Sequence, residues 1–261
     1  MSSLNNIFSN DITEITQYKN KVLYEMATDK TGKIEYKMNE HGYRSKPLKD
    51  KHDMKILTLG CSWTMGVGVD NDKIWPSMIG KQFDNSMVFN YGMYGVSCSF
   101  ISKLCYKILH SGIVPDLILV MWPGFSRRDY INKDCEYRKI GGFRMAHNDD
   151  VVWRNREEDL NFLELQNDYQ DINEFWLSYK FLESLCNNFG IKVHHTIVGY
   201  YYEIFEKHYE YLKSFIDEDN FFIPKSVYKN DLKAVDGEHP SERWHKEFSD
   251  EFFRTISNKK K

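Results

Sequence analysis

The sequence lacks three features that would each define a class of protein. Its 261 residues contain no apolar run of about eighteen residues, so we expect no transmembrane helix and no membrane partner. The amino-terminal region has no basic stretch followed by an apolar core, which predicts the absence of a signal peptide. Basic residues are not in excess either. The formal net charge is -3 and the pI is about 6.3, which argues against a dedicated nucleic-acid binder.

Cysteine is too sparse and too irregularly spaced to define a scaffold. The sequence has five cysteines, an odd number with no C-x-x-C spacing: Cys61, Cys98, Cys105, Cys135 and Cys186. This pattern supports neither a zinc site nor a disulfide framework, and it is typical of reduced thiols in a cytosolic protein. We therefore expect no metal site in this chain.

The most informative stretch lies at residues 55–69, which read KILTLGCSWTMGVGV. Residues 56–59 form a short apolar run that ends at Gly60, the pattern of a buried strand. Ser62 comes just past the strand end, at the carboxyl edge of a sheet, where open α/β sheets bind their ligands. Glycines on both sides of this serine let the backbone turn and let a ligand approach main-chain N–H groups. An ordinary strand-to-loop turn with a capping serine is the alternative.

Other loop motifs fit this stretch less well. No lysine stands where a phosphate-binding Walker A loop requires one. Residues 67–72 look like further loop, whereas a dinucleotide-binding fingerprint opens directly into a helix. The nucleophile elbow G-x-S-x-G fails because Thr64 replaces the second glycine. A flavodoxin-like phosphate loop, rich in Ser, Thr and Gly, remains a competing interpretation.

Apolar runs and amphipathic segments alternate along the rest of the chain. The apolar runs predict strands at residues 56–59, 87–91, 117–121, 192–198 and 221–223. Helical periodicity predicts helices at residues 74–83, 101–108, 171–189, 201–216 and 244–256. Repeated strand–helix units imply a right-handed, mainly parallel five-stranded sheet with helices on both faces. The predicted fold class is therefore a three-layer α/β/α sandwich.

Two segments fall outside this alternation. Residues 1–50 form a polar lead-in, with a weakly helical stretch at residues 12–26 and a turn-rich end. Arg44, near that end, is interpreted as a surface or packing residue rather than a ligand. Residues 122–170 form an insert that is rich in charge and has no clear period, with a length typical of a lid or an interaction surface. Residues 51–261 are thus expected to form one domain that carries this insert.

The carboxyl end supplies a candidate acid–base pair. Asp236 and His239 lie three residues apart in the sequence V-D-G-E-H-P, in a loop before the last predicted helix. On a tight turn the carboxylate can contact the imidazole and fix its tautomer, which leaves Nε2 to act as a base. A helix-capping aspartate beside a surface histidine is the alternative. The pair gains weight because a strand–serine–glycine loop precedes it in the same α/β array.

Taken together, these residues resemble the SGNH, or GDSL-like, hydrolases. Three blocks of that family are matched in order: G-C-S-W-T-M-G at residues 60–66, N-Y-G-M-Y-G at residues 90–95 and D-G-E-H at residues 236–239. The resemblance covers roughly residues 55–256. The first and last blocks are moderately specific alone and more specific as a pair.

The resemblance implies a flavodoxin-like α/β/α sandwich and an ester hydrolase that needs neither a metal nor an organic cofactor. It implies Ser62 as the nucleophile, His239 as the general base and Asp236 as the residue that orients this base. The N–H groups of Ser62 and Gly95 would form the core of the oxyanion hole, with Asn90 beside them. The implied substrate is a small-molecule or glycan ester, with an O-acetyl group on a carbohydrate as the first candidate.

The sequence departs from the family pattern in two places. Cys61 stands where the family usually has the aspartate of G-D-S, which is a supporting position. The third block, normally G-x-N-D, reads M-W-P-G-F-S-R-R at residues 121–128, so the asparagine that donates to the oxyanion is missing. Ser126, one of the arginines Arg127 and Arg128, or a main-chain N–H would have to replace it. The two arginines are otherwise interpreted as surface residues or as partners of the acidic residues of the insert. The loss of one such donor typically costs about 10²–10³ in rate.

Two alternatives to an active esterase remain. The missing asparagine favours a catalytically impaired SGNH-like protein, for example a virion-associated binding or structural component. A flavin-binding module of flavodoxin type is disfavoured by the Asp236–His239 pair. The expected location is accordingly the cytoplasm or a virion.

Overall fold

The fold is described from a computed structural model. The structure describes residues 21–26, 33–46, 54–131, 137–140, 167–198, 202–225 and 233–258.

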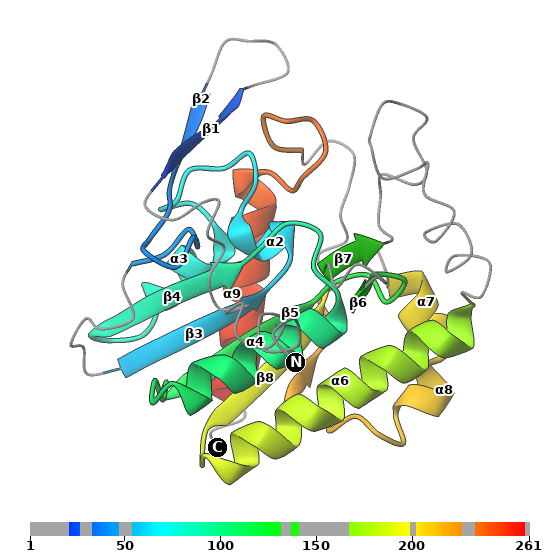
Figure 1. Cartoon of the computed structure of the whole chain (residues 1–261). Helices are drawn as coiled ribbons and strands as arrows, with labels where there is room; N and C mark the ends of the chain where they lie inside the picture. The colour runs from blue at the N-terminus through cyan, green and yellow to red at the C-terminus, as the bar shows by residue number, and fades with distance from the viewer. Residues whose placement is uncertain are drawn as a thin grey trace, which may run out of the picture.

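A five-stranded sheet forms the centre of the molecule (Figure 1). Its strands, in spatial order, are β4 (Ser86–Gly92), β3 (Met54–Gly60), β5 (Leu117–Trp122), β8 (Lys192–Ile197) and β9 (Phe221–Phe222). Every neighbouring pair is parallel. All six residues of β5 are buried, as expected of a central strand that is covered on both faces. The parallel five-stranded sheet predicted from the apolar runs is confirmed.

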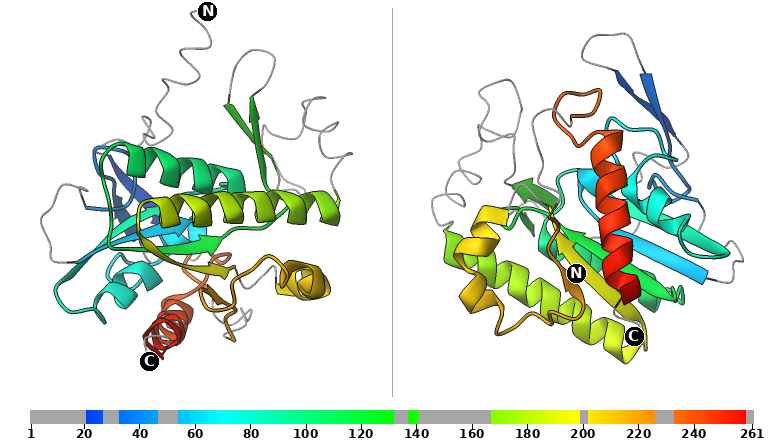
Figure 2. Two further views of the ribbon diagram at one scale, coloured as in Figure 1. Left: turned by 90° about the horizontal axis from the view of Figure 1, so that it is seen from below. Right: turned by 180° about the vertical axis from the view of Figure 1, so that it is seen from behind.

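Helices cover both faces of this sheet (Figure 2). On one face α4 (Cys98–His110) packs against α6 (Asp168–Asn188), and the hydroxyl of Ser102 donates a 2.8 Å hydrogen bond to the carbonyl of Ser178. On the other face α3 (Trp75–Gly80) packs against α9 (Glu242–Asn258), with the Trp75 ring 5.5 Å from that of Phe248. The three-layer sandwich is therefore confirmed as well.

Local sequence signals explain where the two long helices of the first face begin. Ser97 caps α4 by accepting the N–H of Phe100 at 3.0 Å, and Asn167 caps α6 by accepting the N–H of Gln170 at 3.0 Å. The last turn of α4 carries Lys107 and His110, which suit the negative end of a helix dipole. None of the described helices combines the length and the apolarity that a membrane span needs.

The structure corrects the expected elements at several places. Residues 22–26, the end of the stretch expected to be weakly helical, form a strand, β1 (Val22–Met26), which pairs antiparallel with β2 (Lys33–Lys37). Residues 12–20 of that stretch lie outside the described chain. The single helix expected at residues 201–216 is two short ones, α7 (Tyr202–Lys207) and α8 (Tyr209–Leu212). His208 interrupts them with φ -111° and ψ 13°, and both Lys207 and His208 lie close to Asp168 on α6. That tertiary contact overrides the helical periodicity.

Two further elements have no counterpart in the sequence prediction. A one-turn helix, α2 (Ser62–Met65), follows β3 directly. The insert contains a hairpin of β6 (Arg128–Ile131) and β7 (Tyr137–Ile140), while its residues 132–136 and 141–166 lie outside the described chain.

Candidate active site

Ser62 is the first residue of α2, at the carboxyl end of β3. Cys61 makes the turn out of the strand, and the turn closes at Gly66, which has φ +77° and donates its N–H to the carbonyl of Ser62 at 2.9 Å. In the strand order β4-β3-β5-β8-β9 the chain steps from β3 to β4 and then back past β3 to β5. Ser62 thus lies at the topological switch point of the sheet, where open α/β sheets form their binding crevice.

Two glycines let α2 lie directly on the ends of the strands. A Cβ at Gly60 would stand 2.0 Å from Thr64 Oγ1, and a Cβ at Gly92 would stand 2.3 Å from the backbone nitrogen of Met65. Neither position tolerates a side chain without displacing the turn. Thr64, which broke the nucleophile-elbow pattern, is buried within this close packing.

Asn90, expected in the substrate-binding part of the site, holds α2 against β4. Its side chain is buried, donates through Nδ2 to the carbonyl of Thr64 at 2.9 Å, and accepts the N–H of Gly92 through Oδ1 at 3.0 Å. Thr58 Oγ1 lies 3.4 Å from the same Oδ1. These contacts give the asparagine a positioning role for the turn that carries Ser62.

Gly95 lies in the turn after β4, where the backbone has φ +63° and no atom approaches the place of a Cβ within 4 Å. Within the described part of the chain, neither its N–H nor the N–H of Ser62 donates a hydrogen bond. Two main-chain donors therefore remain available at the carboxyl edge of the sheet.

Asp236 and His239 form a tight pair in the loop before α9. The Oδ2 atom of Asp236 contacts Nδ1 of His239, and its Oδ1 atom accepts the N–H groups of Glu238 and His239, both at 3.1 Å. Gly237, between them, has φ +74°. The carboxylate thus fixes the ring through Nδ1 and leaves Nε2 as the other nitrogen of the imidazole.

The electrostatics of this loop keep the carboxylate ionised. Burial alone raises the pKa of Asp236, but the hydrogen bond and charge of His239, together with the two backbone N–H groups, outweigh burial and lower it. An ionised Asp236 at neutral pH can accept a hydrogen bond from Nδ1–H and so stabilise a protonated His239.

Two sets of contacts join this loop, and the helix that follows it, to the residues around Ser62. The carbonyl of Gly68 lies 3.5 Å from the N–H of Val235, and a Cβ at Gly68 would stand 3.2 Å from Asp236 Oδ1. In α9, which follows the loop, the Trp244 ring packs edge to face against Trp63 of α2, with the ring centroids 4.9 Å apart. Figure 1 shows the loop before α9 on the same side of the molecule as α2. In the described residues no hydrogen bond joins the Ser62 hydroxyl to His239. Such bonds often tighten only when substrate is bound.

The third-block loop, residues 123–127, follows β5 at the same edge. Arg128 was expected at the surface or against acidic residues of the insert, but it is buried and contacts Asp171 at the start of α6. It also donates to the carbonyls of Phe125 and Arg127 and so holds the loop in shape. Ser126 and Arg127 are half-buried, in a turn that the Arg127 N–H closes on Gly124 at 3.2 Å.

A buried chain of polar groups, missed by sequence reasoning, supports the start of this loop. Trp122 donates from Nε1 to Nδ1 of His195 at 3.2 Å, and the Nε2 of that ring lies 2.7 Å from Glu183. Burial lowers the pKa of His195, and the nearby Glu183 only partly opposes the effect. The neutral ring is therefore a structural link between α6 and the end of β5.

The β6–β7 hairpin is fixed to the sheet edge by two neighbouring residues. Arg128 ties it to α6, and Asp129 ties it to α4 through Ser97, Ser99 and Lys103, the last at 2.8 Å from its carboxylate. Figure 1 shows the hairpin beyond the end of β5. The described part of the insert therefore begins at the edge of the sheet that carries Ser62.

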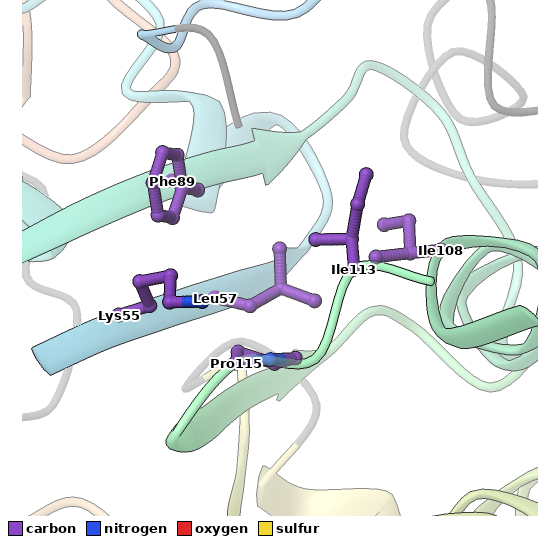
Figure 3. A pocket seen from close by; sticks show the side chains of 6 residues that line it. All are labelled: Lys55, Leu57, Phe89, Ile108, Ile113 and Pro115. Atoms are coloured by element: carbon purple, nitrogen blue, oxygen red, sulfur yellow. The ribbon is translucent and has the colours of Figure 1, made fainter. Parts of the chain in front are cut away.

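Other places in the described chain do not carry comparable chemistry. The described residues contain no group of three or more His, Cys, Asp or Glu side chains placed to hold a metal ion. A small, mainly apolar recess lies near the amino ends of β3 and β5 (Figure 3), lined by Lys55, Leu57, Phe89, Ile108, Ile113 and Pro115. It lacks both a nucleophile and an acid–base pair.

Comparison with known proteins places the fold. No protein-family model and no curated protein matches the sequence. A family two carbohydrate esterase from Clostridium thermocellum, solved with cellohexaose, aligns over 80% of this chain and 65% of its own, with a TM-score of 0.51 and 11% identity. The carbohydrate acetylesterase Est24 from Sinorhizobium meliloti aligns over 79% of this chain and 99% of its own, with a TM-score of 0.50 and 12% identity. TesA aligns over 79% and 99% of the two chains, with a TM-score of 0.51 and 13% identity. Identities this low establish similarity of fold only, and the fold is the α/β fold of the SGNH hydrolases.

Proposed function

We propose that this protein is a serine ester hydrolase of SGNH type. The observation that carries the proposal is the Asp236–His239 pair, with its carboxylate on Nδ1, in a loop that packs against the turn bearing Ser62. The alternative of a capping aspartate beside a surface histidine does not explain that packing. A helix cap also does not require a serine at the switch point of the sheet.

In the proposed reaction, Ser62 Oγ attacks the ester carbonyl while His239 Nε2 takes the hydroxyl proton. The resulting imidazolium is stabilised by Asp236 through Nδ1–H. His239 then gives the proton to the departing alcohol, which leaves the acyl group on Ser62. Water attacks the acyl-enzyme with His239 again as the base, and the acid and free serine are restored.

Two main-chain donors, the N–H groups of Ser62 and Gly95, are proposed to bind the oxyanion. Both are without a hydrogen-bond acceptor in the described chain, and Gly95 lies in an open turn. The third donor, which the family supplies from an asparagine, is assigned here to Ser126. A hydroxyl is a neutral donor, whereas moving the charged Arg127 to the site would require its desolvation.

The proposed substrate class is an acetylated carbohydrate. Support comes from two proteins of the same fold, a carbohydrate esterase solved with cellohexaose and a carbohydrate acetylesterase. At 11% and 12% identity they suggest which ester to test first and define no subsite in this chain.

A fluorophosphonate probe tests the nucleophile directly. We expect peptide mass spectrometry to find the label on Ser62, and Ser62→Ala to lose both labelling and several orders of magnitude of activity on p-nitrophenyl acetate. Ser111→Ala, at an exposed serine after α4, is the matched control and should keep both. Labelling at another residue, or unchanged turnover in Ser62→Ala, would refute the assignment.

The second candidate function is a catalytically impaired SGNH-like binding or structural protein, such as a virion component. The third-block loop favours this second function. The loop lacks the family's asparagine, and Arg128 next to it is paired with Asp171. This candidate predicts no probe labelling and no esterase activity in the intact protein, together with measurable binding to a glycan in a microarray. Labelling of Ser62 would exclude it.

A further inference from the structure

Arg44 lies under the Ser62 turn as a buried cation. Its side chain is only 2% exposed, and it donates to the carbonyls of Met65 at 3.3 Å, Gly66 at 2.7 Å and Val69 at 2.8 Å. No carboxylate forms an ion pair with it among the described residues. Burying a guanidinium is costly unless it is well hydrogen-bonded, so this arrangement requires those three carbonyls to converge on it.

Tyr36, on β2, completes the same contact. Its hydroxyl accepts the N–H of Gly68 at 2.7 Å, and its ring lies 4.3 Å from the Arg44 guanidinium. Met38, next to β2, packs with Met65 and Val67 in a small apolar cluster. The segment 33–46 therefore holds residues 65–69 in three ways: it binds their carbonyls, accepts one of their N–H groups and packs against their side chains.

The loop that Arg44 shapes is also the one on which the acid–base pair rests. Gly68 has φ +74°, and its Cα faces Ala234 and Asp236 so closely that a Cβ there would stand 2.7 Å from Ala234 Cβ. Its carbonyl meets the N–H of Val235. A change in the path of residues 65–69 must therefore move Asp236, and with it His239.

We propose that Arg44 is a positioning residue for the hydrolase site. By fixing residues 65–69, it sets the position of the Asp236–His239 pair relative to Ser62. The inference rests on the proposed function, because it assigns a task within that site. It also places the segment 33–46 inside the catalytic architecture rather than in a lead-in.

Lysine cannot replace arginine in this role. The planar guanidinium donates from two nitrogens to three carbonyls spread over five residues, whereas an ammonium is one compact donor at the end of a flexible stem. Arg44→Lys keeps the positive charge but cannot make the same set of hydrogen bonds to the three carbonyls. The variant therefore separates the effect of positioning from the effect of charge. Arg243→Lys, at an exposed arginine paired with Glu247, is the matched control.

The test compares kcat and KM of Arg44→Lys and Arg243→Lys with those of the parent. In each protein, titration with the fluorophosphonate first gives the fraction of molecules whose Ser62 reacts, and kcat is expressed per reactive molecule. We expect Arg44→Lys to lower kcat by about 10–100-fold with KM within about twofold, since a small misplacement of catalytic groups is expensive. The pH profile of kcat/KM should shift, because His239 loses a fixed partner. Arg243→Lys should leave kcat unchanged. Normal kcat per labelled molecule in Arg44→Lys, with only a lower Tm, would overturn the proposal.

Backbone amide exchange gives a readout that does not depend on activity. In Arg44→Lys we expect faster exchange at residues 234–239, and no such change in Arg243→Lys. If the parent is not labelled at Ser62, the proposed function is wrong. Amide exchange at residues 234–239 then tests by itself whether Arg44 positions the Asp236–His239 loop. Unchanged exchange at residues 234–239 then overturns it. Should Arg44→Lys not fold, Tyr36→Phe removes only the hydroxyl on Gly68 and must show the same effects in weaker form.

Discussion

Asp171→Ala removes the carboxylate that Arg128 contacts on α6 and leaves a cation in the interior. The two side chains are 6% and 8% exposed, so water cannot replace the lost partner. Breaking a buried ion pair from one side typically costs about 3–5 kcal/mol. Arg128 keeps its bonds to the carbonyls of Phe125 and Arg127, which places our expectation at the lower end, about 3 kcal/mol. At about 2–4 °C per kcal/mol, Tm should fall by about 6–12 °C.

The measurement is urea unfolding followed by tryptophan fluorescence, with two companion variants. Asp171→Asn keeps an oxygen acceptor and loses the charge, so its loss should be smaller than that of Asp171→Ala. Glu247→Ala breaks the exposed pair with Arg243, whose side chains are 45% and 73% exposed, and should cost no more than about 0.5 kcal/mol. A loss of less than about 1 kcal/mol in Asp171→Ala, or an equal loss in Glu247→Ala, would show that the buried ion pair does not contribute this much to stability.

The same change also reaches the proposed site. Arg128 holds the loop of residues 123–127, which presents Ser126, and this hold depends on its anchor on α6. Asp171→Ala should therefore lower kcat in the fraction that remains folded. Asp171→Asn, which should lose less stability than Asp171→Ala, should also retain a higher kcat.

Three other predictions follow from single residues. Burial lowers the pKa of His245 to about 3, and nearby positive charges add to this, so the unfolded chain takes up a proton near pH 6.5 that the folded chain excludes. The free energy of unfolding must then fall as the pH drops below about 6.5. In urea unfolding, His245→Asn should lose about 2 kcal/mol less than the parent between pH 7 and pH 5. If the free energies of unfolding of the parent and the variant differ by the same amount at both pH values, this explanation is wrong. Gly92→Ala forces α2 to move and should cut kcat at least about 100-fold. Gly112→Ala, far from the site, meets open space but is strained by its φ of +85°, so it should lower Tm and leave kcat of the folded protein unchanged. Equal kcat in the two variants would show that the turn tolerates the shift. Ser126→Ala should lower kcat by about 10²–10³ with KM nearly unchanged, and no effect would mean that the two main-chain donors suffice.

The sequence predicts those parts of the fold whose signals are local. Apolar runs mark the five strands because a parallel sheet buried on both faces needs them, and β5 is the clearest case. The convergence of Ser62 and the Asp236–His239 loop on one edge follows from parallel topology, once the strands are known.

What sequence reasoning missed depends on distant partners. The sequence indicates only a surface or packing role for Arg44, and a surface position or an acidic partner in the insert for Arg128. Their buried contacts with the carbonyls of residues 65–69 and with Asp171 depend on residues far away in the sequence. Strand β1 is paired with β2, and this pairing is not visible in the weak helical periodicity of residues 12–26. A strand, a buried cation and a one-turn helix of this kind are chosen by tertiary contacts, so propensity alone cannot identify them.

We expect the packing of α9 on α2 and α3 to form late in folding. Trp63 and Trp75 lie early in the chain, yet their covering rings, Trp244 and Phe248, come from its last helix. Contacts so distant in sequence form late, because the chain between them must first be brought into place. Until α9 arrives, two indole rings lack their aromatic cover and the Asp236–His239 loop has no fixed position. In refolding, the proposed ester hydrolysis should therefore appear only with the slowest change in tryptophan fluorescence, when α9 has packed against α2 and α3.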